Sequence, residues 1–468
     1  MYRPILFRQI LSIPRNVVIV TVAGLIVRVL LAPFTSHPYD MGIFYAITQQ
    51  IIKGEMPFWG LGGIPMFYYT LAPVSLLYEL LAGPLNVHPI VISSLPPIVQ
   101  GALGWVTPGN GLTLVIPDWF YNLLVKIPLI ISDFFVGIVL YRIVGDRYGE
   151  RAAFISFCLW FLNPIVVWVS GGWGMFDSFP ALFSVLATYF VLKRSYSLGA
   201  ICLAIGVGYK LYPLLLLVPL VVYSVRTEGN LAKFARPALI FVFTLLVLFL
   251  PLVPQLIQGS STILGSQPGN PSTNPSSTFG LTYWSIAPFT SISGSAVSLI
   301  STLFLILSII IVGVMTAIKV RSIEALFFWE LASISTIFFS YPRVNEQWFL
   351  WLLPFLILIS QSKSRRAVVV GLSLLAVFYL WINSLFTAFF VTDYYLAPNQ
   401  LTLLAKWTTS LSAYRLSIMA ILGVTFSAAL LLFLFKWKNY LPAIINNSPN
   451  LSESVQNSKG SSTISTDS

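Results

Sequence analysis

Ionisable side chains lie beside aromatic residues at several points of an otherwise apolar chain. Asp40 lies in YDMGIFY, Asp177 in GGWGMFDSFP and Lys210 in GYKLYP, while Arg343 and Glu346 share SYPRVNEQW. A carboxylate held near a hydroxyl can act as a general base. Lysine and arginine neutralise phosphate, arginine often through two parallel hydrogen bonds. Together these residue types fit the transfer of a group from a phosphate-bearing lipid.

The composition indicates that a membrane protein must position these residues. Of the 468 residues, 57% are hydrophobic and only 9% are charged, whereas a soluble domain carries about 25% charged residues. The formal net charge of +11 fits basic cytoplasmic loops more simply than a nucleic-acid partner, which we do not expect. Cys158 and Cys202 both fall in apolar runs, so no disulfide framework or metal-ligand spacing is present.

Apolar runs long enough to cross a bilayer predict the transmembrane helices. They lie near 17–34, 119–141, 152–169, 174–192, 197–211, 212–225, 237–257, 295–318, 323–341, 346–362, 367–391 and 412–435. With the N-terminus inside, most of the 26 Lys and Arg residues fall in cytoplasmic segments, as the positive-inside rule predicts. The sequence therefore predicts an all-α, polytopic integral membrane protein with about 12 transmembrane helices and both termini cytoplasmic.

This topology also predicts how the chain is divided. Residues 1–438 form the transmembrane domain, with a large first outer loop at 35–118, a polar outer loop at 259–294 and a last outer loop at 392–411. Residues 439–468 are polar and of low complexity, and we expect a disordered cytoplasmic tail. The ionisable residues beside aromatics then share the outer face, where we expect a polar, aromatic-lined cavity.

Each of these residues also has a purely structural interpretation. Asp40 and Asp177 can cap helices, and Lys210 can extend to the membrane interface. Arg343 and Glu346 are three positions apart and can pair only with each other. No single residue decides between the interpretations, and the functional one depends on the face that they share.

For three other polar residues, we expect only a structural or surface role. Lys126 and Asp133 lie seven positions apart on one face of the second span, and we expect structural pairing with other helices. His37 is interpreted as a structural or surface residue. Aromatic residues at these levels are commonly interface anchors.

Four stretches, in order, resemble a known family. They are YDMGIFYAITQQIIKGEMPFW after the first span, LLVKIPLIISDFFVGIVLYRIV, the pair LNPIVVWVSGGWGMFDSFPALFSVLATYFVLKR and GYKLYPLLLLVPLVV, and RVNEQWFLWLLP. The order is similar to that of GT-C membrane glycosyltransferases that use polyprenyl-phosphate sugars. The resemblance is greatest to the catalytic subunits of GPI mannosyltransferase I and related prokaryotic enzymes, and it covers most of residues 17–362.

The resemblance implies a GT-C-like fold and a hexosyltransferase activity. The enzyme would move a single hexose, with mannose as the expected sugar, from a polyprenyl or dolichyl phosphate to a lipid-linked glycan, glycolipid or protein on the outer face, inverting the anomeric centre. The donor and membrane lipid are then its partners, and a small membrane partner subunit is compatible with the family. Where the family often has a D-x-D pair, Pro38 precedes Asp40 by two positions, so we expect no cofactor and do not favour a divalent metal.

The residues receive the following predicted roles. Asp40 is the catalytic base, Lys210 and Arg343 bind the donor phosphate, and the sugar or acceptor is bound by Asp177, Tyr39, Tyr212 and Glu346. A secondary transporter or lipid flippase is the alternative class, but such proteins commonly show repeated halves, and none is evident here. A non-catalytic scaffold would leave the outer carboxylates without a role.

Overall fold

The computed structural model describes residues 14–54, 65–91, 115–250, 253, 279–386 and 398–438. The predicted tail 439–468 and most of the predicted polar loop 259–294 lie outside the described residues, and so does the side chain of Tyr39. The predicted division into domains therefore stays a prediction.

Each of the twelve predicted spans coincides with a helix or with consecutive helices. These are α2 (Arg15–Leu31), α6 (Trp119–Tyr148), α7 (Glu150–Phe161) with α8 (Pro164–Val167), α9 (Ser178–Leu192), α10 (Tyr196–Tyr209), α11 (Leu217–Glu228), α12 (Ala235–Phe249), α14 (Gly294–Lys319), α15 (Ile323–Ser340), α16 (Phe349–Ile359), α17 (Lys363–Phe386) and α18 (Pro398–Lys438). Within the described residues, six helices are long and apolar enough to cross a membrane, or seven if one bent pair is a single span. The all-α, multi-pass class is confirmed, and the count of twelve stays a prediction.

Shorter elements join these helices. The predicted first outer loop, 35–118, holds α3 (Pro38–Ile52), α4 (Pro65–Ala82) and the antiparallel strands β1 (Ile90–Val91) and β2 (Val115–Ile116). A parallel pair forms from β3 (Phe279–Gly280) and β4 (Arg343–Val344). Short helices of other types are the π-helix η3 (Trp168–Trp173) and the 3-10 helices η4 (Tyr212–Leu216), η5 (Leu231–Phe234), η8 (Tyr283–Phe289) and η9 (Glu346–Trp348).

The second part of the predicted last outer loop, 392–411, is helical. Helix α18 begins at Pro398 and continues without a break through this stretch into the apolar span. Proline suits the first position of a helix, and no glycine or further proline follows until Gly423. The sequence therefore contains nothing that would end the helix before the span.

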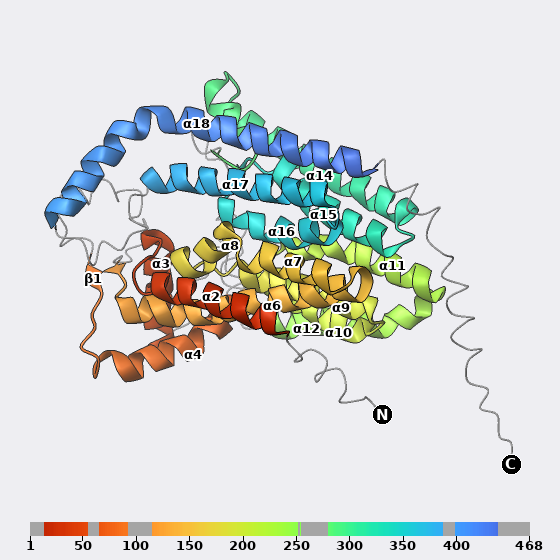
Figure 1. Ribbon diagram of the computed structural model, residues 1–468, viewed down its shortest axis with the longest axis horizontal. Coiled ribbons are helices and arrows are strands. Elements are labelled where there is room, and N and C mark those ends of the chain that lie inside the picture. The colour runs from red at the N-terminus through yellow and green to blue at the C-terminus, as the bar shows by residue number, and fades with distance from the viewer. Residues whose placement is uncertain are drawn as a thin grey trace, which may run out of the picture.

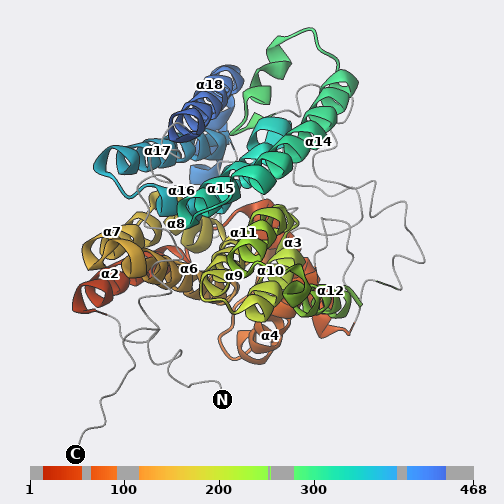
Figure 2. The same cartoon turned by 90° about the vertical axis from the view of Figure 1, so that its right-hand side faces the viewer.

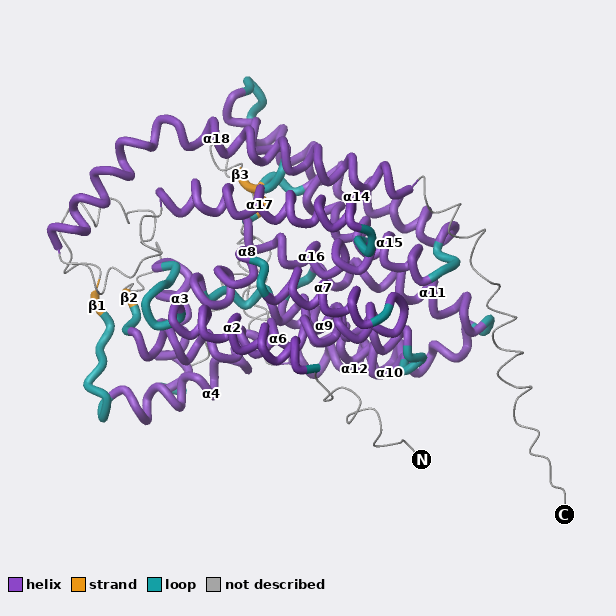
Figure 3. The backbone as a smooth tube through the Cα atoms, viewed as in Figure 1, coloured by secondary structure: helices purple, strands orange, loops and turns teal. Residues whose placement is uncertain are grey.

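The helices form two packed groups. Helices α2 to α12 make one group and α14 to α18 the other, as two views at right angles show (Figures 1 and 2). Most helices run along the long axis of the molecule (Figure 3). Helix α16 belongs to the second group and lies at its boundary with the first. It contacts α6, α7 and α9 of the first group and α15 and α17 of its own group.

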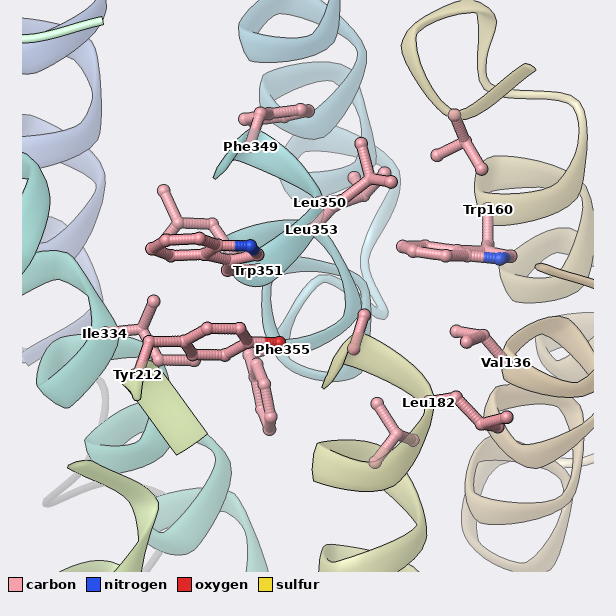
Figure 4. Packing of buried hydrophobic residues seen from close by; sticks show 14 of the residues in the cluster. Val136, Trp160, Leu182, Tyr212, Ile334, Phe349, Leu350, Trp351, Leu353 and Phe355 are labelled. Atoms are coloured by element: carbon pink, nitrogen blue, oxygen red, sulfur yellow. The ribbon is translucent and has the colours of Figure 1, made fainter. Parts of the chain in front are cut away.

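The core sits around α16. All eleven of its residues are buried, as expected of a helix that is apolar all round. Trp351 and Phe355 lie beside Tyr212, which belongs to the other group (Figure 4). By contrast, α12 and α14 expose apolar side chains along most of their length, which suits a lipid environment.

Candidate active site

Asp40 lies in the first turn of α3 and accepts two contacts on one oxygen. Trp173 donates its indole N–H to Oδ2 at 2.7 Å, and Nδ1 of His37 lies 2.9 Å from the same atom. The His37 and Trp173 rings stack with centroids 5.0 Å apart. The carboxylate is 21% exposed, and its Oδ1 has no hydrogen-bond partner in the described part of the chain. One oxygen is therefore held by the protein and the other is left for a ligand.

The environment keeps this carboxylate ionised. Burial raises the pKa of Asp40, but the charge of His37, hydrogen bonds from His37 and Trp173, and the charge of Lys210 together outweigh it and hold the pKa below its ordinary value. Opposite charges and hydrogen bonds favour the charged form of a carboxyl group. Asp40 is therefore a carboxylate at neutral pH, the form that a general base requires.

The chain leaves Trp173 through a backbone turn that requires glycine. The π-helix η3 ends at Gly174, whose φ of +92° is left-handed. A Cβ atom there would lie 2.7 Å from Sδ of Met41 and 3.1 Å from Cε of Lys126. Since glycine adopts this conformation without cost and without a clash, Gly174 allows the chain to turn directly after Trp173 and to pack against Met41 and Lys126.

Asp177 and Lys210 form a buried ion pair. Nζ of Lys210 lies 2.8 Å from Oδ1 of Asp177, and Trp351 donates its indole N–H to the same oxygen at 2.7 Å. Asp177 is fully buried and makes no capping hydrogen bond to α9, so its interpretation as a helix cap is wrong. Its second oxygen, Oδ2, has no partner among the described residues.

Lys210 does not extend into the lipid interface. Its ammonium group lies 4.9 Å from the ring centroid of Phe176 and 5.2 Å from that of Trp351, and the side chain is 16% exposed. Its charge also acts on Asp40. The structure thus brings Asp40, Asp177 and Lys210, predicted from three separate loops, into one cluster.

Aromatic rings support the ion pair from one side. Trp351 stacks between Tyr212 and Trp348, with centroid separations of 4.4 and 4.5 Å and interplanar angles of 12° and 16°. Tyr212 is only 3% exposed, and its hydroxyl accepts a hydrogen bond from Ser184 at 3.5 Å. The stack orients the indole N–H that Trp351 gives to Asp177.

A second polar cluster surrounds Glu346. Its Oε1 accepts a hydrogen bond from Nδ2 of Asn383 at 2.7 Å, and Oδ1 of Asn383 accepts one from Arg415 at 2.5 Å. Glu346 therefore does not pair only with Arg343. It is 1% exposed, and its Oε2 has no partner in the described ranges. The charge of His37 acts on Glu346 as well, which connects this cluster to Asp40.

Arg343 lies in the short parallel strand pair, three positions before Glu346. Phe279 is paired with Arg343 and Gly280 with Val344. Gly280 has a φ of +123°, and a Cβ atom on it would lie 1.9 Å from the carbonyl oxygen of Val344. Glycine thus allows the end of the polar outer loop to lie against the strand that carries Arg343.

Two further buried charges, Asp133 and Lys126, hold these segments together. Asp133 pairs with Arg28 at 3.1 Å and accepts hydrogen bonds from Ser170 and Ser178, each at 2.5 Å. This network joins α2, α6, η3 and the start of α9. The predicted structural pairing is confirmed for Asp133.

Lys126 is buried and bonds to backbone rather than to an acid. Its Nζ donates to the carbonyl oxygens of Ala32 at 3.0 Å, Gly172 at 2.9 Å and Thr35. These carbonyls belong to the chain before His37 and to the turn that carries Trp173. Lys126 therefore fixes both segments that hold Asp40.

Sequence reasoning missed several residues of the site. His37 was interpreted as structural, and Trp173 and Trp351 as interface anchors, while Asn383 carried no signal. The position of His37 three residues before an acid at a helix start could have found it. Arg415 was detectable as one of the few basic residues away from the cytoplasmic segments.

A metal-binding set is not evident in the described residues. No group of three or more His, Cys, Asp or Glu side chains there is arranged to hold an ion. The expectation that the site works without a metal stays a prediction.

Comparison with known proteins supports the resemblance inferred from the four motifs. No family model matches the chain. Over 123 residues it is 25% identical to GPI mannosyltransferase 1 of Saccharomyces cerevisiae, and over 123 residues it is 27% identical to that of Candida albicans. Each match covers 25% of this chain and 30% of the relative. The chain thus spans less than a third of the length of these curated relatives. The predicted similarity to mannosyltransferases of this kind is confirmed.

Among solved structures, the chain matches two of ArnT from Cupriavidus metallidurans. The structure bound to undecaprenyl phosphate matches with a TM-score of 0.46 and 13% identity, over 89% of this chain and 76% of that chain. The apo structure matches with a TM-score of 0.43 and 12% identity over the same shares.

Proposed function

We propose that the protein is a membrane glycosyltransferase that moves one hexose, mannose, from a polyprenyl or dolichyl phosphate to an acceptor hydroxyl. The acceptor is a lipid-linked glycan, a glycolipid or a protein. The observation that carries the proposal is the clustering of Asp40, Asp177 and Lys210 from three loops. The relatives named GPI mannosyltransferase 1 support the sugar and the reaction class.

Unpartnered buried oxygens support a sugar as ligand. Oδ2 of Asp177 and Oε2 of Glu346 are buried carboxylate oxygens that take no hydrogen bond within the described part of the chain. Leaving such an atom unsatisfied costs about 1–3 kcal/mol or more. Hexose hydroxyls can supply the missing donors, so we assign both residues to sugar or acceptor binding. Tyr39 and Tyr212 remain assigned to the same subsite.

Asp40 acts as the base in this proposal. Its unoccupied Oδ1 takes the proton of the acceptor hydroxyl while that oxygen attacks C1 of the sugar from the face opposite the phosphate. The bond from C1 to the phosphate oxygen breaks, and the electron pair leaves with the polyprenyl phosphate. The anomeric centre is therefore inverted, and Asp40 then passes its proton to water.

The leaving phosphate gains negative charge as the bond breaks, so cations must oppose it. An ammonium group has three N–H donors. Lys210 gives one to Asp177 and keeps two for the phosphate. Arg343 supplies a second cation, and Arg415, held by Asn383, supplies a third on the same side.

The proposed orientation rests on the charge distribution along the sequence, and the other parts of the proposal rest on the family resemblance. The site faces the outer side of the membrane, and both termini are cytoplasmic. The donor reaches the site from the bilayer, and the enzyme works without a metal. A small membrane subunit is compatible with this arrangement.

A transfer assay with purified protein in lipid nanodiscs tests the proposal. With mannose linked to a polyprenyl phosphate and a glycolipid acceptor, the wild type should form product, and Asp40→Asn should lose nearly all transfer while it still binds the donor. Wild-type rates in Asp40→Asn would contradict the role of Asp40. In sealed vesicles, movement of unmodified solute without transfer would instead identify a transporter.

A further inference from the structure

A pocket lies at the end of the helices opposite the candidate active site. It has a volume of about 200 Å³ and is lined by Tyr148, Glu324, Phe327, Leu358, Ile359, Gln361 and Arg365. Helix α15 begins beside it and ends near Arg343, and α16 begins near the site and ends beside the pocket. At 1.5 Å per residue, the 18 residues of α15 place the pocket and the site about 27 Å apart.

Glu324 brings an unpartnered oxygen to this pocket. Its Oε1 accepts a hydrogen bond from Nε of Arg147 at 2.5 Å and one from the hydroxyl of Tyr148 at 3.5 Å. Its Oε2 has no partner among the described residues, and the residue is only 9% exposed. A buried carboxylate oxygen without a donor is costly, so a ligand that presents a hydroxyl would be favoured here.

Positive charge exceeds negative charge around the pocket. Arg365 lines it, and Arg366 donates to Gln361, another lining residue, at 3.3 Å. Nε of Arg366 is buried without a partner in the described ranges, and the like charge of Arg151 acts on Arg366. The one acid of the pocket, Glu324, is already paired with Arg147. An anion would relieve the repulsion between these arginines.

The remaining wall is apolar. Phe327, Leu358 and Ile359 line the pocket and belong to helices that pack in the core. A ligand that fits all three properties has a phosphate, a hydroxyl donor and a hydrocarbon chain. Basic pockets between membrane helices commonly bind anionic lipid headgroups.

We propose that this pocket binds a phospholipid whose headgroup carries a hydroxyl as well as a phosphate. The phosphate contacts Arg365 and Arg366, the hydroxyl donates to Oε2 of Glu324, and the first part of the chain covers Phe327 and Ile359. The site is independent of the proposed transfer reaction, and its occupant would link the ends of α6, α15, α16 and α17.

Native mass spectrometry of the detergent-purified full chain tests this, with phosphatidylglycerol, phosphatidic acid and phosphatidylethanolamine of the same chains as probes. Phosphatidylglycerol should bind more tightly than the other two lipids. Arg365→Met and Arg366→Met should each weaken it about fivefold, which corresponds to about 1 kcal/mol. Glu324→Gln should remove the preference for phosphatidylglycerol over phosphatidic acid.

Lys363→Met is the matched control, since Lys363 is exposed in the first turn of the same helix and does not line the pocket. The proposal is overturned if this control weakens binding as much as Arg365→Met, or if the arginine variants bind phosphatidylglycerol as the wild type does. Equal binding of phosphatidylglycerol and phosphatidic acid to the wild type would also overturn it. Displacement of the lipid by millimolar glycerol phosphate would show that the occupant is a soluble phosphate compound. Monodisperse elution of each variant confirms that it is folded.

Discussion

Lys210 and Asp177 form a 2.8 Å ion pair in which the Asp177 side chain is fully buried and the Lys210 side chain is 16% exposed. The pair joins the loop before α9 to the loop after α10, and Trp351 of α16 donates to the same carboxylate oxygen. Lys210 is thus both a structural partner of Asp177 and the proposed phosphate ligand. These two roles can be separated by experiment, because substituting Lys210 and Asp177 together should restore stability but not transfer.

Lys210→Met should destabilise the protein, because it leaves the Asp177 carboxylate buried without its cation. Breaking a buried pair by removing one partner costs about 3–5 kcal/mol. The double variant Asp177→Asn with Lys210→Met should recover most of this loss, since no uncompensated charge remains, but it should not recover transfer. Thermal unfolding together with the transfer assay measures both effects. Recovery of transfer in the double variant would contradict the phosphate role of Lys210.

His37→Gln should move the acid limb of the pH profile of transfer to higher pH. The charge and the hydrogen bond of His37 lower the pKa of Asp40, so their removal raises that pKa and protonates the base at a higher pH. In the wild type, the base should lose its proton-accepting form only below the ordinary carboxyl pKa of about 3.9. Initial rates from about pH 2.5 to 8, which include the acid limb of the wild type, measure the shift.

His88→Gln provides the control for His37→Gln, because His88 is an exposed histidine outside the site. Its pH profile should match that of the wild type. An unchanged acid limb in His37→Gln would show that His37 does not act on the base.

Gly174→Ala should lower both stability and transfer. The alanine would have to adopt a φ of +92° and would place its Cβ 2.7 Å from Met41. Left-handed backbone costs about 1–2 kcal/mol for an L-residue, and the clash adds to this and moves Trp173 away from Asp40. Unfolding temperature and transfer rate measure the result.

Gly313→Ala is the comparison for Gly174→Ala. Gly313 lies inside α14, where an added Cβ would meet nothing within 4 Å. Alanine favours a helix interior over glycine by about 1 kcal/mol, so this variant should show no loss. Equal losses in the two variants would rule out the turn as the cause.

Arg415→Met should weaken donor binding more than it slows the bound complex. A hydrogen bond to a charged group is worth about 1.5–3 kcal/mol, which corresponds to a rise in the donor KM of about tenfold or more. Lys406→Met removes an exposed charge from the same helix and should leave the KM unchanged. An equal rise of the donor KM in the two variants would contradict a direct contact between Arg415 and the donor phosphate.

Hydropathy alone determined the helical class and the approximate positions of the helices that coincide with the predicted spans, because the tendency of an apolar run to enter lipid is a local property of the chain. The start of α18 was missed, because helix formation continues beyond the apolar run wherever no residue stops it. From the sequence, Asp40, Asp177, Lys210 and Arg343 were also predicted to lie at the same face of the membrane.

The tertiary structure decided which of these residues meet. Asp177 and Lys210 are 33 positions apart, and Asp40 and Trp173 are 133 apart. Such contacts depend on how helices cross and on turns such as that at Gly174, which no local pattern encodes. For the same reason, Asn383 and the orphaned oxygens of Asp177 and Glu346 became visible only when the side chains were placed. A hydrogen-bond partner is a property of the packed molecule, whereas a tendency to enter the membrane is a property of the segment.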